Sequence, residues 1–366
     1  MARLGDIATY VNGFAFKPAD WSDEGLPIIR IQDLTGNSYQ ANRYSGEYHP
    51  KYEVNDGDVL ISWSASLGVY VWESEKAVLN QHIFKVVFDK AEVDKSFFVH
   101  QVQNILEKAA SEAHGATMKH LTKPVFDALP FYLPDVKTQR EIASVLDQVS
   151  NLIALRREQL TKHDELLKAR FVELFGDKAY PEDTLLNLCN IIDYRGKTPE
   201  KVESGLPFIT AKNVRMHQMN LEPREYISKE TYDKVMVRGF PKEGDVVFTT
   251  EAPLGNVCRI PHFDTEFYIG QRIVTLQTEK LEPIYLEYAL SSDDFKMKYM
   301  GKSSGSTVTG IRVRLLEQLT IPVPPIELQS QFAAFVEQTD KSKLAIQRSL
   351  DKLENLKKAL MQKYFG

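Results

Sequence analysis

The chain has 366 residues, of which 43% are hydrophobic and 26% charged, a composition typical of globular proteins with two or three domains. No apolar run approaches the ~20 residues of a membrane-spanning helix, the N-terminus lacks the apolar core of a signal peptide, and Cys189 and Cys258 have no metal-ligand spacing. We therefore expect a soluble, cytoplasmic protein with free thiols, and the net charge of −5 argues mildly against nucleic acid unless acids and bases are segregated.

The first 128 residues have the pattern of an α+β module. Short runs of β-branched and apolar residues are separated by Gly, Asn and Ser turns, which predicts strands, and a helical pattern follows at residues 95–110. The strand-like runs are Pro27–Ile31, Asp58–Ser62, Gly68–Trp72 and His82–Phe88.

Residues 129–176 begin with the proline-rich segment Leu129–Pro134 and continue as a charged amphipathic pattern. Leucine or isoleucine recurs every seven residues, no proline or glycine interrupts the run, and Pro134 and Gly176 stand where a helix would begin and end. The pattern predicts one long helix that begins between Thr138 and Ser150. The recurring positions are Leu146, Ile153, Leu160, Leu167 and Leu174.

Residues 319–366 repeat residues 129–176 at a constant offset of 190, without a gap. The proline-rich segment, a glutamine five residues after it and the final Phe-Gly all recur, so we interpret the repeat as real. The second stripe has Lys343 and Lys357 where the first has Ile153 and Leu167, which leaves its register open. Neither stripe is long enough for a free-standing coiled coil, and we expect the two helices to pack on each other, antiparallel.

Residues 177–318 repeat the first module more loosely, with an offset that drifts from 180 to 190. Several landmarks correspond while the residues between them differ widely, as in two copies of one scaffold. The second-copy landmarks are Gly205–Pro207, Gly244–Val247, Leu254–Gly255, Gln271–Val274 and Gly305–Thr307, answering Gly25–Pro27, Gly57–Leu60, Leu67–Gly68, Gln81–Phe84 and Gly115–Thr117.

The order is therefore module, helix, module, helix, with expected boundaries at 1–134, 135–176, 177–324 and 325–366. We predict an α+β protein with two similar α/β modules in inverted orientation, separated by two long antiparallel, coiled-coil-like helices. One polypeptide would then imitate a symmetric dimer. Two similar binding modules on a spacer suit a ligand with twofold character, and duplex DNA is the commonest such ligand.

A search for catalytic motifs finds none that is specific. The chain has no Gly-x-Gly-x-x-Gly after a strand, no Gly-Lys-Ser/Thr of a P-loop, no Gly-x-Ser-x-Gly elbow and no Asn/Asp-Pro-Pro-Tyr of adenine methyltransferases. His114 and His120 are six residues apart without an obvious third ligand. We therefore expect no catalytic residue and no metal site in this chain.

Two acid-free basic windows favour nucleic-acid binding. They lie between Glu112 and Asp127 and between Asp294 and Glu317, at matching positions of the repeat. Such windows would place phosphate-neutralising charge on both modules, although either could be a solvated loop. The candidate phosphate contacts are Thr117, Lys119, Lys123, Lys302, Ser306, Thr307 and Arg312.

Candidate base-reading residues follow strand-like runs or module landmarks. Most are of the types that recognise base edges, namely Arg, Lys, Asn, Gln and Ser/Thr, and exposed polar turns are the alternative interpretation of each. We expect Trp63 and Trp72 to be core residues. The candidates are Arg30, Gln32, Asp33, Ser62, Ser64, Gln81, His82, Lys212, Asn213, Arg215, Thr249, Thr250, Gln271 and Arg272.

Over its full length the chain resembles the specificity subunits of type I restriction-modification systems. That family has two variable target-recognition domains, each followed by a helical region with a proline-rich start and a Gln-x-x-Ile/Phe-Ala motif. Here the matching segments are Pro134–Ala143 and Pro324–Ala333, and the second region ends near Leu356–Met361. Gly-Asp-Val before an apolar strand and the Gly-Ser/Ala-Thr loop also recur in such domains.

The resemblance implies a non-catalytic, DNA-binding subunit. Each recognition domain would read one half of a bipartite, asymmetric site, and the helices would set the spacer and dock two methyltransferase subunits. Those partners would bring S-adenosylmethionine and methylate an adenine in each half, and restriction subunits would add ATP- and Mg-dependent translocation and cleavage. Two alternatives stay open: a protein-interaction scaffold with duplicated modules, and a nuclease with a dispersed site.

Overall fold

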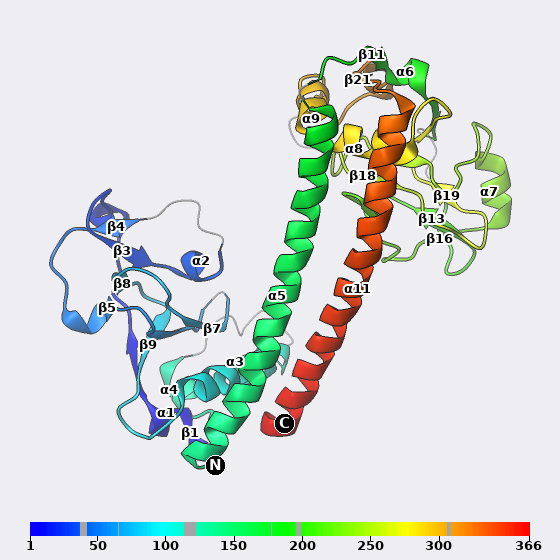
Figure 1. Ribbon diagram of the computed structural model, residues 1–366. Coiled ribbons are helices and arrows are strands. Elements are labelled where there is room, and N and C mark those ends of the chain that lie inside the picture. Colours follow the sequence, from blue (N-terminus) through cyan, green and yellow to red (C-terminus); the bar gives the residue numbers. More distant parts are fainter. Residues whose placement is uncertain (37–41, 65, 113–121, 177, 195–198, 306–308) are drawn as a thin grey trace. The chain divides into compact units, whose positions relative to one another are not determined.

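A computed structural model covers the chain, and it describes all residues except 37–41, 65, 113–121, 177, 195–198 and 306–308. The chain divides into two compact units: unit 1 comprises Met1–Glu158 with Gln347–Gly366, and unit 2 comprises Gln159–Ile346. Both units combine helices and sheets (Figure 1), so the predicted α+β class is confirmed. Within the described ranges, no helix combines the length and apolarity needed to cross a membrane.

Unit 1 contains two four-stranded sheets. The first is antiparallel, with the order β2-β9-β6-β7, and the second has the order β4-β3-β8-β5 with a parallel β3–β8 pair. The strands of the first sheet are β2 (Thr9–Asn12), β6 (Val59–Ser62), β7 (Gly68–Val71) and β9 (Ile83–Val87). Those of the second are β3 (Leu26–Ile29), β4 (Arg43–Tyr44), β5 (Glu53–Val54) and β8 (Ala77–Leu79).

Unit 2 repeats this arrangement. Its antiparallel sheet has the order β12-β20-β17-β18, and its second sheet has the order β16-β13-β19 with a parallel β13–β19 pair. The same connectivity in both units confirms the internal repeat. The strands are β12 (Asn190–Asp193), β13 (Leu206–Ile209), β16 (Tyr226–Ile227), β17 (Val246–Thr249), β18 (Val257–Arg259), β19 (Tyr268–Ile269) and β20 (Ile273–Gln277).

Smaller elements also correspond between the units. A two-stranded pair next to a short helix opens each module, formed by β1 (Ala2–Arg3), β10 (Pro130–Phe131) and α1 (Leu4–Ile7) in unit 1, and by β11 (Glu182–Thr184), β21 (Thr320–Pro322) and α6 (Leu185–Leu188) in unit 2. Unit 1 also has α2 (Ile31–Leu34), α3 (Lys95–Glu112) and α4 (Lys123–Asp127). Unit 2 has β14 (Val214–Arg215), β15 (Gln218–Met219), α7 (Lys229–Val235), α8 (Pro283–Ser291), α9 (Asp293–Met300) and α10 (Val313–Leu316).

Two helices of 40 residues each, α5 (Val136–Phe175) and α11 (Ile326–Phe365), belong partly to each unit. Each is about 60 Å long. Their ranges lie within the expected helical regions 135–176 and 325–366, and α5 begins before Thr138, the earliest starting point that the apolar pattern predicted.

The two long helices pair antiparallel inside each unit. In unit 2, His163 contacts the carbonyl of Thr339 at 2.8 Å, while Phe171, further along α5, packs on Phe332, which lies earlier in α11. In unit 1, Arg157 pairs with Glu354 at 2.7 Å, and the buried start of α5 packs against the last turns of α11. The predicted inverted orientation of the two modules stays a prediction.

An ion pair explains why a lysine interrupts the apolar stripe of the second long helix at position 343. Ile153 and Leu167 are buried on α5, whereas Lys343 of α11 remains 40% exposed and pairs with Asp164 at 2.6 Å. The lysine occupies a seam position of the sequence repeat, but it lies at the edge of the helix pair, where its ammonium group reaches a carboxylate.

A buried glutamine anchors the start of each long helix. Gln139 and Gln329 are each 1% exposed. The Nε2 of Gln139 donates to the carbonyl of Pro134 at 2.8 Å, and its Oε1 accepts from the backbone N–H of Asp94 at 2.8 Å. Gln329 makes the same bonds to Pro324 and Glu282, at 2.7 and 2.9 Å. Because Asp94 and Glu282 precede α3 and α8, each glutamine ties a long helix to the module helix packed on it.

Candidate nucleic-acid interface

In unit 1, four short segments meet at one end of the antiparallel sheet β2-β9-β6-β7. We call residues 12–14, 30–35, 62–64 and 80–82 the first tip. The indole Nε1 of Trp63 donates to Asn12 Oδ1 at 3.3 Å, and its ring lies 5.0 Å from that of His82. The backbone N–H of Asn80 donates to the carbonyl of Ile29 at 3.2 Å, which continues the β3–β8 pairing, and the N–H of Phe14, which follows β2, donates to the carbonyl of Leu79 at 2.8 Å and so joins the two sheets at this end. Candidate residues from three separate parts of the chain are thereby brought together.

In unit 2, the corresponding loops form a second tip, residues 210–215, 249–251, 270–272 and 310–312. The N–H of Thr250 donates to the carbonyl of Arg272 at 2.9 Å, and the N–H of Ile311 donates to the carbonyl of Thr250 at 2.9 Å. The guanidinium of Arg272 pairs with Glu251 at 2.9 Å. A hollow of about 340 Å³ opens here, lined by Thr250, Glu251, Gln271, Ser304, Gly310, Ile311 and Arg312.

The two tips share one backbone skeleton. The Trp63 N–H to His82 carbonyl bond of the first tip, 3.3 Å, matches the Thr250 to Arg272 bond of the second. The Asn80 to Ile29 bond matches a bond of 2.7 Å from Gly270 to Ile209. In both tips a two-residue turn precedes the central strand, β9 or β20. Most side chains carried on this skeleton differ between the tips.

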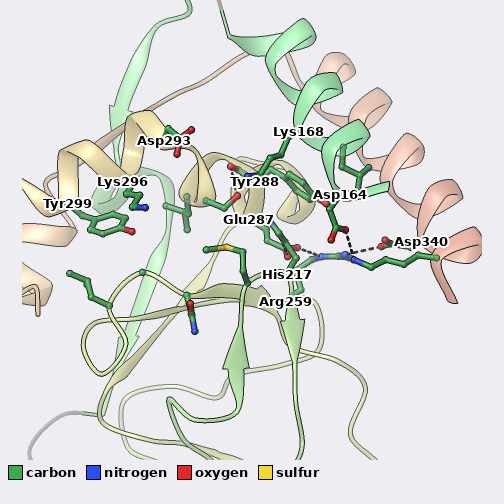
Figure 2. A pocket seen from close by; sticks show the side chains of 18 residues that line it. Asp164, Lys168, His217, Arg259, Glu287, Tyr288, Asp293, Lys296, Tyr299 and Asp340 are labelled. Atoms are coloured by element: carbon green, nitrogen blue, oxygen red, sulfur yellow. Dashed lines mark hydrogen bonds and ion pairs between the residues drawn. The ribbon is translucent and has the colours of Figure 1, made fainter. Parts of the chain in front are cut away.

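A second cluster of charged groups lies deeper in unit 2, around a cavity of about 510 Å³ (Figure 2). Glu287 of α8 is 2% exposed, and its carboxylate accepts from Arg259 Nε at 2.7 Å and contacts His217 Nδ1 at 2.9 Å. Arg259 also reaches Asp340 of α11 at 3.9 Å, and the ring of His217 stacks on Tyr288 with centroids 4.3 Å apart. The cluster connects β18, α8 and α11.

The chemistry of this cluster is structural. Glu287 is paired twice and the nearby cations mostly have acidic partners, so the groups neutralise one another in place. Burial raises the pKa of Asp340, the carboxylate that α11 contributes to the cluster. Burial also raises the pKa of the thiols of Cys189 and Cys258 to about 12, which makes both poor nucleophiles. Sequence reasoning missed the cluster because no local pattern shows which acid will meet which base.

The family model of the type I restriction modification DNA specificity domain matches residues 1–163 and 184–357. The chain belongs to this family. It is 26% identical to the EcoBI specificity subunit of Escherichia coli over 405 residues, covering 99% of the chain and 84% of that protein. It is 23% identical to the MjaVIII specificity subunit of Methanocaldococcus jannaschii, covering 99% of the chain and 90% of that protein.

Two solved structures have the same fold. The S subunit of a type I restriction-modification system from M. genitalium superposes with a TM-score of 0.60 at 15% identity, covering 100% of this chain and 95% of that one. A chain from a study of complex assembly and conformational transition of the type I R-M system gives 0.55 at 19% identity, covering 100% and 96%. The resemblance predicted from the sequence is therefore confirmed, and a scaffold unrelated to DNA specificity is not favoured.

As a specificity-family member, the chain needs side chains that are exposed and not already bonded within the chain, and several candidates fail one of these conditions. Asp33 and Asn213 accept from the backbone N–H groups of Arg30 and Thr210 at 2.8 and 2.9 Å, so each caps its own turn. Asn213 is 1% exposed, and its Nδ2 donates to two carbonyls. These bonds give both residues a structural role, and we remove them from the candidate contacts.

Two buried hydroxyls are removed for the same reason. Ser62 and Thr249, at equivalent strand ends, are fully buried. The Ser62 hydroxyl donates to the carbonyl of Ser64 at 3.2 Å, and the Thr249 hydroxyl accepts from the N–H of Asn256 at 2.9 Å. Ser64 is also buried, with 5% of its surface exposed.

The other candidates divide by exposure and charge pairing. Lys123 pairs with Asp127 one turn along α4, and Arg30 lies near Asp33 and over the ring of Trp21. The exposed or half-exposed candidates that remain are Gln32, Gln81, His82, Lys212, Arg215, Gln271, Arg272, Lys302 and Arg312. Thr250 is largely buried but lines the hollow. Thr117, Lys119, Ser306 and Thr307, as well as His114 and His120, lie outside the described residues.

Proposed function

We propose that each module reads one half of a bipartite, asymmetric DNA site through its tip. The observation that carries this proposal is the repeated tip, in which one backbone skeleton holds different side chains. His82 of the first tip corresponds to Arg272 of the second, and Gln32 corresponds to Lys212. Arginine and lysine donate to guanine, whereas glutamine pairs with adenine. Two tips that differ in this way would select two different short sequences.

Exposed cations of the second tip suit this role in spite of the overall negative charge. Lys212, Arg215, Lys302 and Arg312 are exposed, and they lie in or beside the loops of the tip. Cations near a reading surface contribute sequence-independent affinity by displacing counterions from DNA.

We propose that α5 and α11 set the gap between the two half-sites. Removal of one heptad from each, residues 154–160 and 347–353, shortens the pair by about 10 Å and keeps the apolar period. About 10 Å corresponds to roughly three base pairs at 3.4 Å per step. The preferred gap should therefore shorten by about three base pairs while both half-sites keep their sequences.

We further propose that this chain performs no catalytic step and works in a complex. Two modification subunits would dock on the long helices, bring S-adenosylmethionine and methylate one adenine in each half-site. Restriction subunits would add ATP- and Mg-dependent translocation and cleavage. Support comes from the relatives, which are named as specificity subunits, and from the structural neighbour that was solved in work on assembly of a type I R-M complex.

A selection from random duplex DNA tests the proposal. The full chain, purified with its modification subunits, should enrich two short unlike blocks separated by a fixed gap, and binding should weaken steeply with salt. Enrichment of a single uninterrupted block would contradict the division of labour between the modules. Weak binding that is insensitive to salt would instead favour a protein-interaction scaffold.

A further inference from the structure

Gln81 and Gln271 are the same residue type at equivalent positions of two otherwise different tips. Each is the first residue of the two-residue turn that precedes the central strand of its module. The residue before each glutamine donates its N–H to β3 or β13, and the residue after it accepts from the neighbouring loop. The skeleton therefore presents both side chains from the same place.

Neither glutamine has a structural role that would explain its identity. Gln81 is exposed and Gln271 half-exposed. Their side-chain amides form no hydrogen bond with another residue in the described part of the chain, unlike the amides of Gln139 and Gln329. A shared folding requirement of the turn would need a partner, so the shared residue points to a shared ligand.

The surroundings of Gln271 indicate the chemistry of that ligand. Gln271 lines the 340 Å³ hollow together with Ser304 and Arg312, which provide an amide, a hydroxyl and a guanidinium group. The one carboxylate among the lining residues, Glu251, is already paired with Arg272. Three donors around a hollow whose acid is neutralised suit an acceptor-only anion such as a phosphate.

We propose that Gln81 and Gln271 each donate to a phosphate of the DNA backbone and fix the register of their tip on its half-site. The inference rests on the proposed function. Besides the proposed target adenine, half-sites of different sequence share their sugar-phosphate backbone. The donor groups around Gln271 suit a phosphate, so we place the contact common to both tips there, and the differing residues at 32/212 and 82/272 read bases. Gln81 and Gln271 are thus positioning residues in sequence recognition.

The test uses the full chain with its modification subunits and a duplex that carries the selected site. Gln271→Ala should weaken binding about tenfold, the effect of one hydrogen bond to a charged acceptor, while the selected sequence stays the same. Ethylation of one phosphate in one half-site should weaken the wild-type complex and leave the variant unaffected. Gln81→Ala should behave in the same way in the other half-site.

Gln318→Ala is the matched control, because Gln318 is an exposed glutamine of unit 2 that follows α10 and lies next to α6 rather than at the tip. It should bind as the wild type does. A changed base preference in either glutamine variant, or unchanged affinity in both, would overturn the inference. If the wild type itself selected no bipartite site, the proposed function would fail instead, so the two failures are distinguishable.

Discussion

The two modules share the backbone bonds of their tips and differ in the side chains mounted on them. Residues 29, 63, 80 and 82 of the first module make the same backbone contacts as residues 209, 250, 270 and 272 of the second. The caps Asp33 and Asn213 even exchange a carboxylate for an amide without changing the bond. The comparison shows that hydrogen bonding fixes the frame of a recognition tip, which leaves the exposed positions free to vary.

Beyond the shared glutamine anchors Gln139 and Gln329, the modules differ in how they are attached to the long helices. In unit 1, Asp147 of α5 accepts from Ser96 at 2.6 Å and contacts His100 at 2.8 Å, both on α3. In unit 2, Glu287 of α8 holds Arg259, which reaches Asp340 of α11. Counted from the N-caps Asp94 and Glu282, the residue equivalent to Glu287 is Val99. This second attachment is therefore polar in both units but uses unrelated residues.

The largest expected effect is a loss of stability at the glutamine anchors, which the two units share. Gln139→Ala and Gln329→Ala each remove a buried amide and leave a backbone N–H and a carbonyl without their side-chain partner, so each should lower the free energy of unfolding by roughly 2–4 kcal/mol. Chemical denaturation measures the loss. Gln148→Ala, on the exposed side of α5, is the control and should stay within about 0.5 kcal/mol of wild type. A loss of stability at only one of the two glutamines would contradict their equivalence in the two units.

A somewhat smaller loss of stability is expected at Glu287, where the two units differ. Glu287→Val introduces the residue of unit 1 and leaves Arg259 and His217 without their carboxylate, at an expected cost of about 1–3 kcal/mol. The cost is below that of a fully buried pair because the Arg259 side chain is 33% exposed. In a double-mutant cycle with Arg259→Leu, the combined loss should be less than the sum of the single losses. Strict additivity would show that the pair does not couple.

The next effect concerns Asp33, which caps the turn that Asn213 caps in unit 2. Asp33→Ala should cost about 1 kcal/mol, the usual worth of a lost side-chain cap, and Asp33→Asn should be nearly neutral because unit 2 uses asparagine there. Neither change should alter the DNA sequence selected by the complex. A shifted base preference in Asp33→Asn would return this residue to the reading surface.

The smallest expected effect is the pH dependence of stability that His100 of unit 1 contributes. Burial lowers the pKa of His100, against the opposing influence of Asp147 and together with the repulsion from Lys357. The unfolded chain, with a histidine pKa of about 6.5, therefore binds the proton first, so the stability contributed by neutral His100 is present above pH ~6.5 and declines as the pH falls below it. Unfolding measured from pH 7.5 to 5.5 should show a smaller decline for His100→Gln than for wild type. Equal slopes would contradict this assignment.

Sequence reasoning succeeded where the pattern is periodic or repeated. The seven-residue spacing from Leu146 to Leu174 and the constant offset of 190 indicate both the long helices and the duplicated modules. It also located the loops of the tips, because those loops follow recognisable strands. The landmark repeats of Gln81 and Gln271 were visible as well, although the roles of the two residues were not.

The sequence could not separate reading residues from capping residues. Asp33 and Asn213 are of types that both bind bases and cap turns, and only the short bonds to Arg30 and Thr210 decide between these roles. Burial of Ser62 and Thr249 depends on neighbouring strands that lie far away in sequence. The charged cluster around Glu287 likewise brings together residues from β18, α8 and α11, which no local pattern connects.

The central claim is that each tip independently reads its own half of the DNA site. The most direct test determines the sequence selected by the wild-type complex and by Lys212→Gln/Arg272→His, which places the first tip's residues on the second. The account predicts a changed base preference in one half-site, with the other half-site and the gap preserved. A change in both half-sites, or in neither, would contradict it.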